Sequence, residues 1–214
     1  MIKGTPELIA QRREEIINAC EQLYRKMSFR EITLKEISSI TSFSRPTIYN
    51  YFETKEEIFL ALFQREYERW NEDLTAILEN NEELAGAELA EKIARSLAGR
   101  QQLLKLLSMN IYDMEANSRQ ELLTQFKVAY GRSMQLVRKL LEKFCPDMEE
   151  TDIRSFLYTF YPFMFGIYPY AEVTEKQKTA MEEAGVDYVS MTVYELTLRC
   201  LMQLLGERQD GLKQ

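Results

Sequence analysis

The chain of 214 residues has no histidine and only three cysteines. Without histidine it lacks the commonest general base, a common metal ligand and every His-dependent catalytic triad. The cysteines, Cys20, Cys145 and Cys200, are odd in number, far apart and set in apolar helical patterns, which favours buried free thiols over disulfides or a zinc site. We therefore expect no metal and no cofactor, and no motif in the sequence favours an enzyme.

Residues that break helices are also scarce. The chain has five prolines and eight glycines, no strand-like alternation of useful length and no internal repeat. The N-terminus, MIKGTPELIAQRREEI, lacks the apolar core of a signal peptide. The most apolar segment, residues 156–171, is shorter than the roughly 20 residues of a membrane span and contains Pro162 and Pro169. These features predict an all-α protein of the cytoplasm with no membrane contact.

Charge is distributed unevenly along the chain, whose net charge is −7. Residues 1–55 hold nine Lys or Arg against seven Asp or Glu, a net charge of +2. Residues 56–214 hold eighteen against twenty-seven, a net charge of −9. This asymmetry is typical of a small DNA-binding head on an acidic body. We therefore predict two domains, residues 1–55 and residues 56–214.

The segment Thr33 to Lys55, TLKEISSITSFSRPTIYNYFETK, has the pattern of two short helices joined by a turn and followed by the start of a third. Thr33 and Glu36 form a capping-box pattern that begins the first helix. The apolar residues of this helix recur at helical spacing, which predicts one buried face. That face consists of Leu34, Ile37 and Ile40.

The second helix follows a break in the pattern at residues 41–44. Ser44 is a natural N-cap, and Pro46 is tolerated in the first turn. Ile48 and Phe52 are expected inside the protein, which leaves the polar side chains of this helix free for base edges and phosphates. The arrangement predicts a helix-turn-helix whose second helix enters the major groove of DNA.

Residues 29–58, FREITLKEISSITSFSRPTIYNYFETKEEI, resemble the DNA-binding segment of the tetracycline-repressor-like (TetR) family of bacterial regulators. The shared features are the opening Thr33, the YxYF pattern that ends at Phe52, and the Lys-Glu-Glu run from Lys55. Ser42 stands where the family usually has glycine, and a left-handed backbone at Ser42 would cost about 1–2 kcal/mol. The resemblance implies a three-helix head followed by a larger helical domain for ligand binding and dimerisation.

Specific DNA contacts can be assigned within this segment. Arg45 is placed for a bidentate pair with guanine, and Thr47 for a base edge or a thymine methyl group. The polar residues after Thr47 match the backbone contacts of the family, so we expect them to hold the head on phosphates. The predicted DNA-binding residues are Thr33, Ser44, Arg45, Pro46, Thr47, Tyr49, Asn50, Tyr51 and Lys55.

The rest of the chain has helical periodicity throughout. Helices are expected at residues 8–27, 55–78, 84–98, 101–115, 118–144, 151–170 and 187–205, with a polar connection or short solvated helix at 172–185. The helix at 55–78 would be about 36 Å long, enough to run from the head into the second domain. Residues 156–171 would form a helix that is apolar on all sides and should be buried, and Pro162 should kink or break it.

Ten methionines and twenty-three Phe and Tyr residues suit an adaptable apolar pocket, although an ordinary helical core uses the same residues. The predicted pocket residues are Trp70, Met109, Tyr112, Phe126, Tyr130, Phe160, Phe163, Met164 and Tyr168. Because the resembled family dimerises through its last two long helices, the predicted interface residues are Ile153, Phe156, Leu157, Leu196, Cys200, Leu201 and Leu204.

Together these features predict a homodimeric, ligand-responsive DNA-binding regulator. We expect a repressor that releases a palindromic double-stranded operator when a small apolar or amphipathic effector binds the C-terminal domain. One alternative is a DNA-binding dimer without an effector, whose body serves dimerisation or recruits another protein. A second alternative is an all-helical enzyme that uses a buried tyrosine or carboxylate. The sequence does not separate the first alternative from the regulator with an effector.

Overall fold

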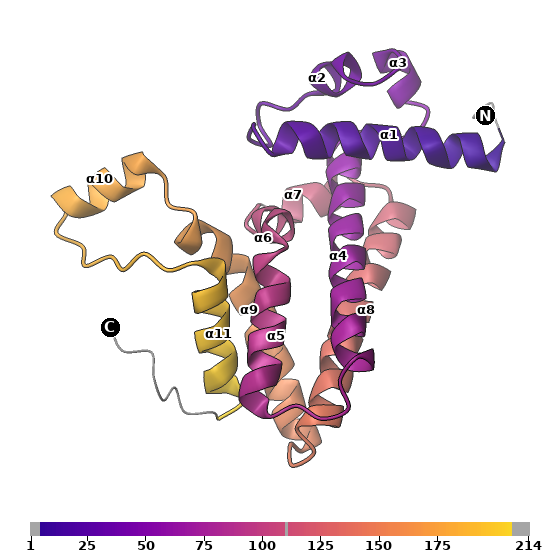
Figure 1. Cartoon of the computed structure of the whole chain (residues 1–214). Coiled ribbons are helices and arrows are strands. Elements are labelled where there is room, and N and C mark those ends of the chain that lie inside the picture. The colour runs from indigo at the N-terminus through magenta and orange to yellow at the C-terminus, as the bar shows by residue number, and fades with distance from the viewer. Residues whose placement is uncertain (1–4, 110, 207–214) are drawn as a thin grey trace. The chain divides into compact units, whose positions relative to one another are not determined.

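The computed structural model describes residues 5–109 and 111–206, and these residues form α-helices without any strand. The prediction of an all-α protein is therefore confirmed (Figure 1). The helices are α1 (Pro6–Tyr24), α2 (Leu34–Ser39), α3 (Arg45–Ile48), α4 (Lys55–Glu79), α5 (Gly86–Ala98), α6 (Gln101–Leu107), α7 (Ile111–Ala116), α8 (Gln120–Phe144), α9 (Glu150–Ala171), α10 (Glu175–Glu183) and α11 (Val193–Leu204).

The described residues pack into two compact units. The head unit comprises residues 5–66 and 111–130, and the body unit comprises residues 67–109 and 131–206. Helices α4 and α8 each contribute residues to both units. The boundary predicted at residue 55 is one between a DNA-binding segment and a body segment. It concerns function rather than packing, and it stays a prediction. The packing adds to the head two segments that lie beyond that division, residues 56–66 and 111–130.

The head unit is held together by apolar residues of α1 and α4. Cys20 and Tyr24 lie on the buried face of α1. The ring of Phe59 packs edge-on against Tyr24, with 5.1 Å between ring centroids, and against Phe29 at 4.8 Å. At the edge of this core, Arg65 of α4 forms an ion pair with Glu21 of α1 at 2.6 Å. These contacts fix α1 against the first half of α4.

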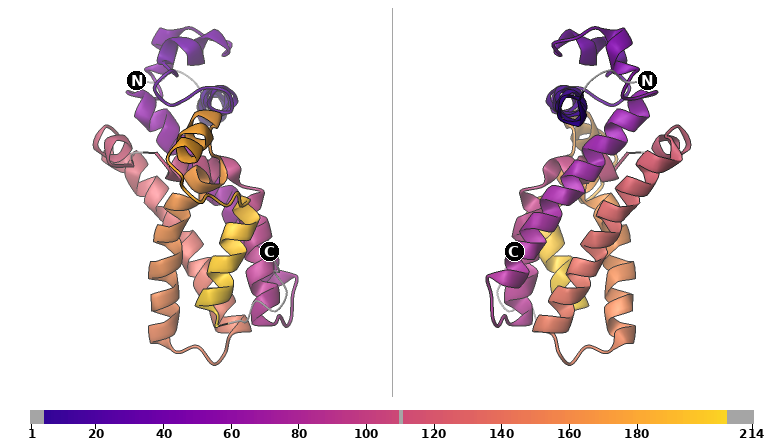
Figure 2. Two further views of the ribbon diagram at one scale, coloured as in Figure 1. Left: turned by 90° about the vertical axis from the view of Figure 1, so that its left-hand side faces the viewer. Right: turned by 90° about the vertical axis from the view of Figure 1, so that its right-hand side faces the viewer.

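The body unit is a set of packed helices in which α11 contacts both α5 and α9 (Figures 1 and 2). The apolar face of α5 is fully buried and consists of Leu89, Ala90, Ile93, Ala94 and Leu97. Trp70 of α4 is also fully buried, and its indole N–H donates to the Ser96 hydroxyl of α5 at 3.0 Å. Lys143 of α8 donates to the carbonyl of Leu78 in the last turn of α4, where helix carbonyls lack intrahelical partners, and to the carbonyl of Asn81 just past the helix.

Two expectations about helix limits need correction. The helix predicted at 101–115 is two helices, α6 and α7, because the chain turns at Ser108. The last helix begins at Val193 rather than Asp187, because the Thr192 hydroxyl accepts the Glu195 N–H and caps the helix there.

Pro162 does not break α9, which is continuous from Glu150 to Ala171. The carbonyl that the missing N–H of Pro162 leaves free belongs to Tyr158. Tyr158 is 72% exposed and Pro162 is also exposed, so water can reach this carbonyl. None of the helices that the structure describes has the length and hydropathy of a membrane span.

Candidate DNA-binding site

Helix α2 begins as the sequence predicts. The Thr33 hydroxyl accepts the backbone N–H of Lys35 at 3.2 Å and donates to the Glu36 carboxylate. Leu34 and Ile37 are buried. Ile40, which the helical pattern placed on the same buried face, is instead 42% exposed, because α2 ends at Ser39 and the backbone of Ile40 is no longer helical.

The turn between α2 and α3 carries no strain at Ser42. No described residue other than glycine has a positive φ, so Ser42 does not adopt the left-handed conformation in which a side chain is costly. Instead, both the backbone N–H and the hydroxyl of Ser42 donate to the Glu15 carboxylate of α1, the hydroxyl at 3.0 Å. A glycine would lack this second hydrogen bond. The departure from the family pattern therefore ties the turn to α1.

Helix α3 is shorter than the sequence predicts, with four residues from Arg45 to Ile48. The next residues continue in tight turns, in which the N–H of Asn50 donates to the Thr47 carbonyl and the N–H of Tyr51 to the Ile48 carbonyl. The Ser44 hydroxyl lies 3.3 Å from the Thr47 hydroxyl and does not cap a backbone N–H. Ile48 and Phe52 are fully buried, as expected.

This packing leaves one side of α3 and the following turn open to solvent. Arg45, Pro46, Tyr49 and Asn50 are exposed, and Thr47 is half-buried. The Arg45 guanidinium donates to the Tyr49 hydroxyl at 3.0 Å and lies 5.7 Å from the centre of its ring. The segment thus presents a guanidinium, an amide and a phenol together, a set of donors that suits base edges and phosphates.

Two of the predicted DNA contacts are engaged inside the head unit. Tyr51 is 3% exposed, and its hydroxyl accepts a hydrogen bond from Arg12 of α1 at 3.3 Å. The Lys55 ammonium donates to the carbonyls of Phe29 at 2.9 Å and Ile32 at 3.2 Å, and it lies 4.0 Å from the centre of the Phe29 ring. A phosphate contact by Lys55 would have to replace these bonds, so its role on DNA stays a prediction.

Sequence reasoning missed a pair of residues beside this site. Glu57 near the start of α4 is 1% exposed and forms an ion pair with Arg119, which immediately precedes α8, at 2.7 Å. Burial acts to raise the pKa of Glu57, but hydrogen bonds from Arg119 and from two backbone N–H groups outweigh it and hold the pKa below its usual range. The pair is separated by 62 positions, and no local motif connects its members.

The predicted effector pocket is divided between the two units. Trp70, Phe160 and Met164 are fully buried in the body unit. In the head unit, Tyr112 is 82% exposed, whereas Phe126 is 2% exposed and packs on Phe63. The remaining residues of the set are half-buried, namely Met109, Tyr130, Phe163 and Tyr168. Neither unit by itself brings the whole set together, and the predicted pocket stays a prediction.

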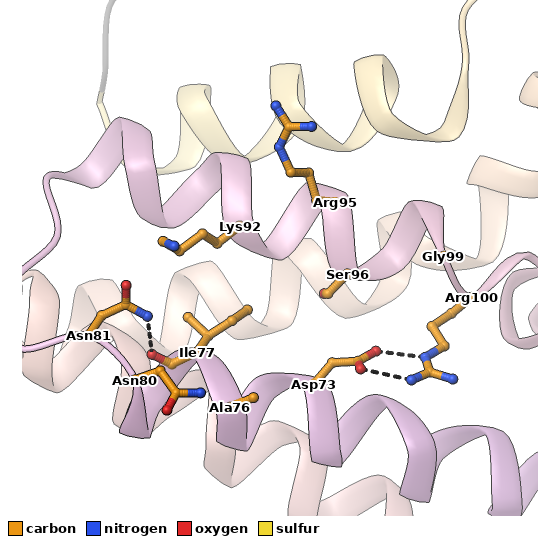
Figure 3. A pocket seen from close by; sticks show the side chains of 10 residues that line it. All are labelled: Asp73, Ala76, Ile77, Asn80, Asn81, Lys92, Arg95, Ser96, Gly99 and Arg100. Atoms are coloured by element: carbon orange, nitrogen blue, oxygen red, sulfur yellow. Dashed lines mark hydrogen bonds and ion pairs between the residues drawn. The ribbon is translucent and has the colours of Figure 1, made fainter.

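A polar cleft of about 720 Å³ opens between α4 and α5 within the body unit (Figure 3). At one end, Arg100 and Asp73 form a two-pronged ion pair with bonds of 2.6 and 2.8 Å. Lys92 and Arg95 of α5 also line the cleft, and Ala76 and Ile77 form an apolar strip. Arg95 pairs with Glu91 and Arg100 with Asp73, whereas Lys92 forms no ion pair among the described residues. The Lys92 ammonium therefore suits a ligand that carries an anionic group.

Four of the predicted dimer-interface residues already lie in the core of a single chain. Ile153, Phe156, Leu157 and Leu201 are at most 4% exposed. Leu196, Cys200 and Leu204 are half-buried on α11. The exposed side of α9 carries Tyr158 at 72% and Phe165 at 38% exposure. A partner subunit can therefore reach these last two side chains directly, whereas the four core residues serve the fold of the protomer.

The short α2–turn–α3 segment, with donors exposed on α3, defines the helix-turn-helix class of DNA-binding proteins. Residues 16–62 match the family described as "Bacterial regulatory proteins, tetR family", and residues 64–206 match "Tetracyclin repressor-like, C-terminal domain". The chain belongs to the tetR family of transcriptional regulators, which are not enzymes. No curated protein matches it.

Several solved structures share the fold. The fatty acid degradation regulator FadR from Bacillus halodurans is 16% identical with a TM-score of 0.59, and the match covers 99% of each chain. FadR from Thermus thermophilus, a repressor in complex with lauroyl-CoA, is 20% identical with a TM-score of 0.60, over 95% of this chain and 100% of that chain. FadR from Bacillus subtilis, in complex with stearoyl-CoA, is 16% identical with a TM-score of 0.59, over 92% and 99%.

Proposed function

We propose that the protein is a dimeric repressor in the bacterial cytoplasm that binds a nearly palindromic operator and releases it when an amphipathic effector binds. The observation that supports this proposal best is the exposed set on α3 and its turn: Arg45, Pro46, Tyr49 and Asn50. Two equal heads in a dimer would read two inverted half-sites, since the symmetry of the protein is matched by that of its DNA.

Arg45→Ala tests the reading of bases. Loss of a bidentate contact costs about 1–3 kcal/mol in each half-site, so a dimer should bind its operator roughly 30-fold more weakly or worse. A duplex selected from a random pool by the wild-type protein serves as the operator in a fluorescence-anisotropy titration. Arg132→Ala, which removes an exposed arginine from the body unit, is the matched control and should bind as wild type. An equal loss in both variants would contradict a base-reading role for Arg45.

The dimer can be tested on the exposed side of α9. Tyr158→Glu introduces a charge at a side chain that is 72% exposed, so the protomer should keep its fold and fail to dimerise. Tyr112→Glu, at an 82% exposed position of the head unit, should leave the dimer intact. Light scattering at micromolar concentration reports the mass, and circular dichroism reports the fold. A Tyr158→Glu variant that stays dimeric would place the interface elsewhere.

The α4–α5 cleft favours an amphipathic effector over a purely apolar one, because the Lys92 ammonium suits a phosphate or carboxylate group and Ala76 and Ile77 suit a chain. Acyl-CoA thioesters combine both features, and two structures with the same fold hold them. We expect lauroyl-CoA to raise the melting temperature and to release the operator, and Lys92→Ala to weaken both effects. No response to lauroyl-CoA, stearoyl-CoA, lauric acid or coenzyme A would favour the DNA-binding dimer without an effector.

A further inference from the structure

A buried carboxylate joins two parts of the head unit that are distant in sequence. The Glu57 carboxylate accepts the Glu53 N–H at 2.7 Å and the Arg119 N–H at 3.0 Å. It also accepts two bonds from the Arg119 guanidinium, from Nε at 2.7 Å and from an Nη at 2.9 Å. Four donors on a side chain that is 1% exposed leave this charge fully compensated, unlike a surface ion pair.

The same guanidinium reaches the end of the DNA-reading segment. Arg119 donates to the Tyr51 carbonyl at 3.2 Å, and Arg13 of α1 donates to that carbonyl at 3.5 Å. The N–H of Tyr51 in turn donates to the carbonyl of Ile48, the last residue of α3. One rigid, planar side chain therefore holds both the first turn of α4 and the backbone just past α3.

A second bond fastens the same two segments. The Thr54 hydroxyl donates to the Asn117 carbonyl at 2.9 Å and accepts the Glu57 N–H at 3.1 Å. Residues 117–119 thus contact residues 51–57 at two points. Because these residues immediately precede α8, the position of the start of α8 is linked to the C-terminal end of α3.

We propose that Arg119 is a positioning residue for operator binding. It acts through Glu57 and the Tyr51 carbonyl to fix the orientation in which α3 is presented to DNA. Residues 131–144 of α8 belong to the body unit, so α8 is a second helix, beside α4, through which the body can alter the head. This inference rests on the proposed DNA-binding function, and it adds a regulatory connection along α8 to the one along α4.

The test compares Arg119→Lys with Arg65→Lys. A lysine at either position keeps the charge but loses the planar fork. Arg65 is a matched control because it also makes three side-chain bonds in the head unit, to Glu14, Asn18 and Glu21, but none to residues 51–57 or 117–119. We expect Arg119→Lys to weaken binding to the selected operator tenfold or more, and Arg65→Lys to weaken it less than threefold, although both variants melt at lower temperature than wild type.

Amide hydrogen exchange provides a readout that a merely structural role would not change. In the wild type, operator DNA should increase protection at residues 117–122 as well as at residues 45–52. In Arg119→Lys the increase at 117–122 should disappear while that at 45–52 remains. If Arg119→Lys does not fold, the double variant Glu57→Gln/Arg119→Gln avoids leaving a buried charge alone and should show the same two losses.

The outcomes separate this inference from the function on which it rests. A wild-type protein that binds no duplex overturns both. A wild type that binds while Arg119→Lys binds within threefold of it, with operator-dependent protection at 117–122 intact, overturns the positioning role alone. Equal losses of affinity in Arg119→Lys and Arg65→Lys also overturn it, because they would show a general loss of head stability.

Discussion

Replacement of Lys55 by methionine separates a structural role from a role on DNA. The Lys55 ammonium donates to two carbonyls, those of Phe29 and Ile32, and lies over the Phe29 ring. Methionine keeps the apolar stem of the side chain and removes the charge and its donors. Ile32 is fully buried, so its carbonyl would have little access to water as a replacement partner.

The expected loss in the free energy of unfolding follows from these contacts. A hydrogen bond from a charged donor contributes about 1.5–3 kcal/mol, and an exposed cation–π contact about 0.5–1 kcal/mol. The two hydrogen bonds share one half-buried ammonium and do not add in full. We therefore expect Lys55→Met to lower the free energy of unfolding by about 2–4 kcal/mol. Urea denaturation at neutral pH measures this difference, and Lys26→Met, at an exposed lysine of the same unit, should change it little.

Operator binding across a salt series completes the test. If Lys55 serves the fold, Lys55→Met should leave the slope of log K against log salt unchanged under conditions where the variant is folded. If Lys55 instead contacts a phosphate, the slope should fall by about 0.9 for each head. Unchanged stability together with a smaller slope would refute the structural role that we assign to Lys55.

Two further predictions follow from the titrating groups. The hydrogen bonds that hold the pKa of Glu57 below its usual range stabilise the fold above the unfolded-state pKa of about 4.3, and this stabilisation is lost as pH falls through the lower folded-state pKa. Glu57→Gln should therefore show a weaker loss of stability between pH 6 and pH 3 than wild type in urea denaturation. Burial raises the pKa of the fully buried Cys20 thiol and raises that of Cys200 to about 11. At pH 8 Cys20 should react with a disulfide reagent only after unfolding and Cys200 only slowly, whereas rapid labelling of Cys20 in the native protein would contradict the packing of α1.

A capping side chain within three residues makes a helix start predictable, although the predicted start at Asp187 did not use this signal at Thr192 and Glu195. Thr33 caps α2 through bonds within its own first turn, and such a signal is visible in the sequence. The break between α6 and α7 has no comparable local signal. Apolar residues continue at helical spacing past Ser108, and neither proline nor glycine marks the end of α6. Such a break depends on tertiary packing, which one sequence does not reveal.

The DNA-binding site was likewise predictable only where local helical spacing determines which side chains are buried. Helical spacing was enough to place Ile48 and Phe52 inside and Arg45 outside. It failed for Tyr51, whose burial depends on Arg12 and Arg13, 39 and 38 positions earlier in the chain. Arg119 lies 68 positions after Tyr51, and the sequence around it has no feature that points to the helix-turn-helix. Contacts across such separations are set by the packing of α1, α4 and α8.

The charges of the head also explain why the net charge of residues 1–55 says little about DNA affinity. Within the part of the chain that the structure describes, some of these cations are used internally: Arg25 pairs with Glu21, and Lys55 donates to two backbone carbonyls. The exposed cations of the head that form no ion pair among the described residues are Lys26, Arg30, Lys35 and Arg45. If all four in each head of a dimer neutralised a phosphate, the salt slope would reach about −7. A steeper slope would require phosphate contacts beyond these four cations, for example by Lys55, whose ammonium would then exchange its carbonyl partners for phosphates.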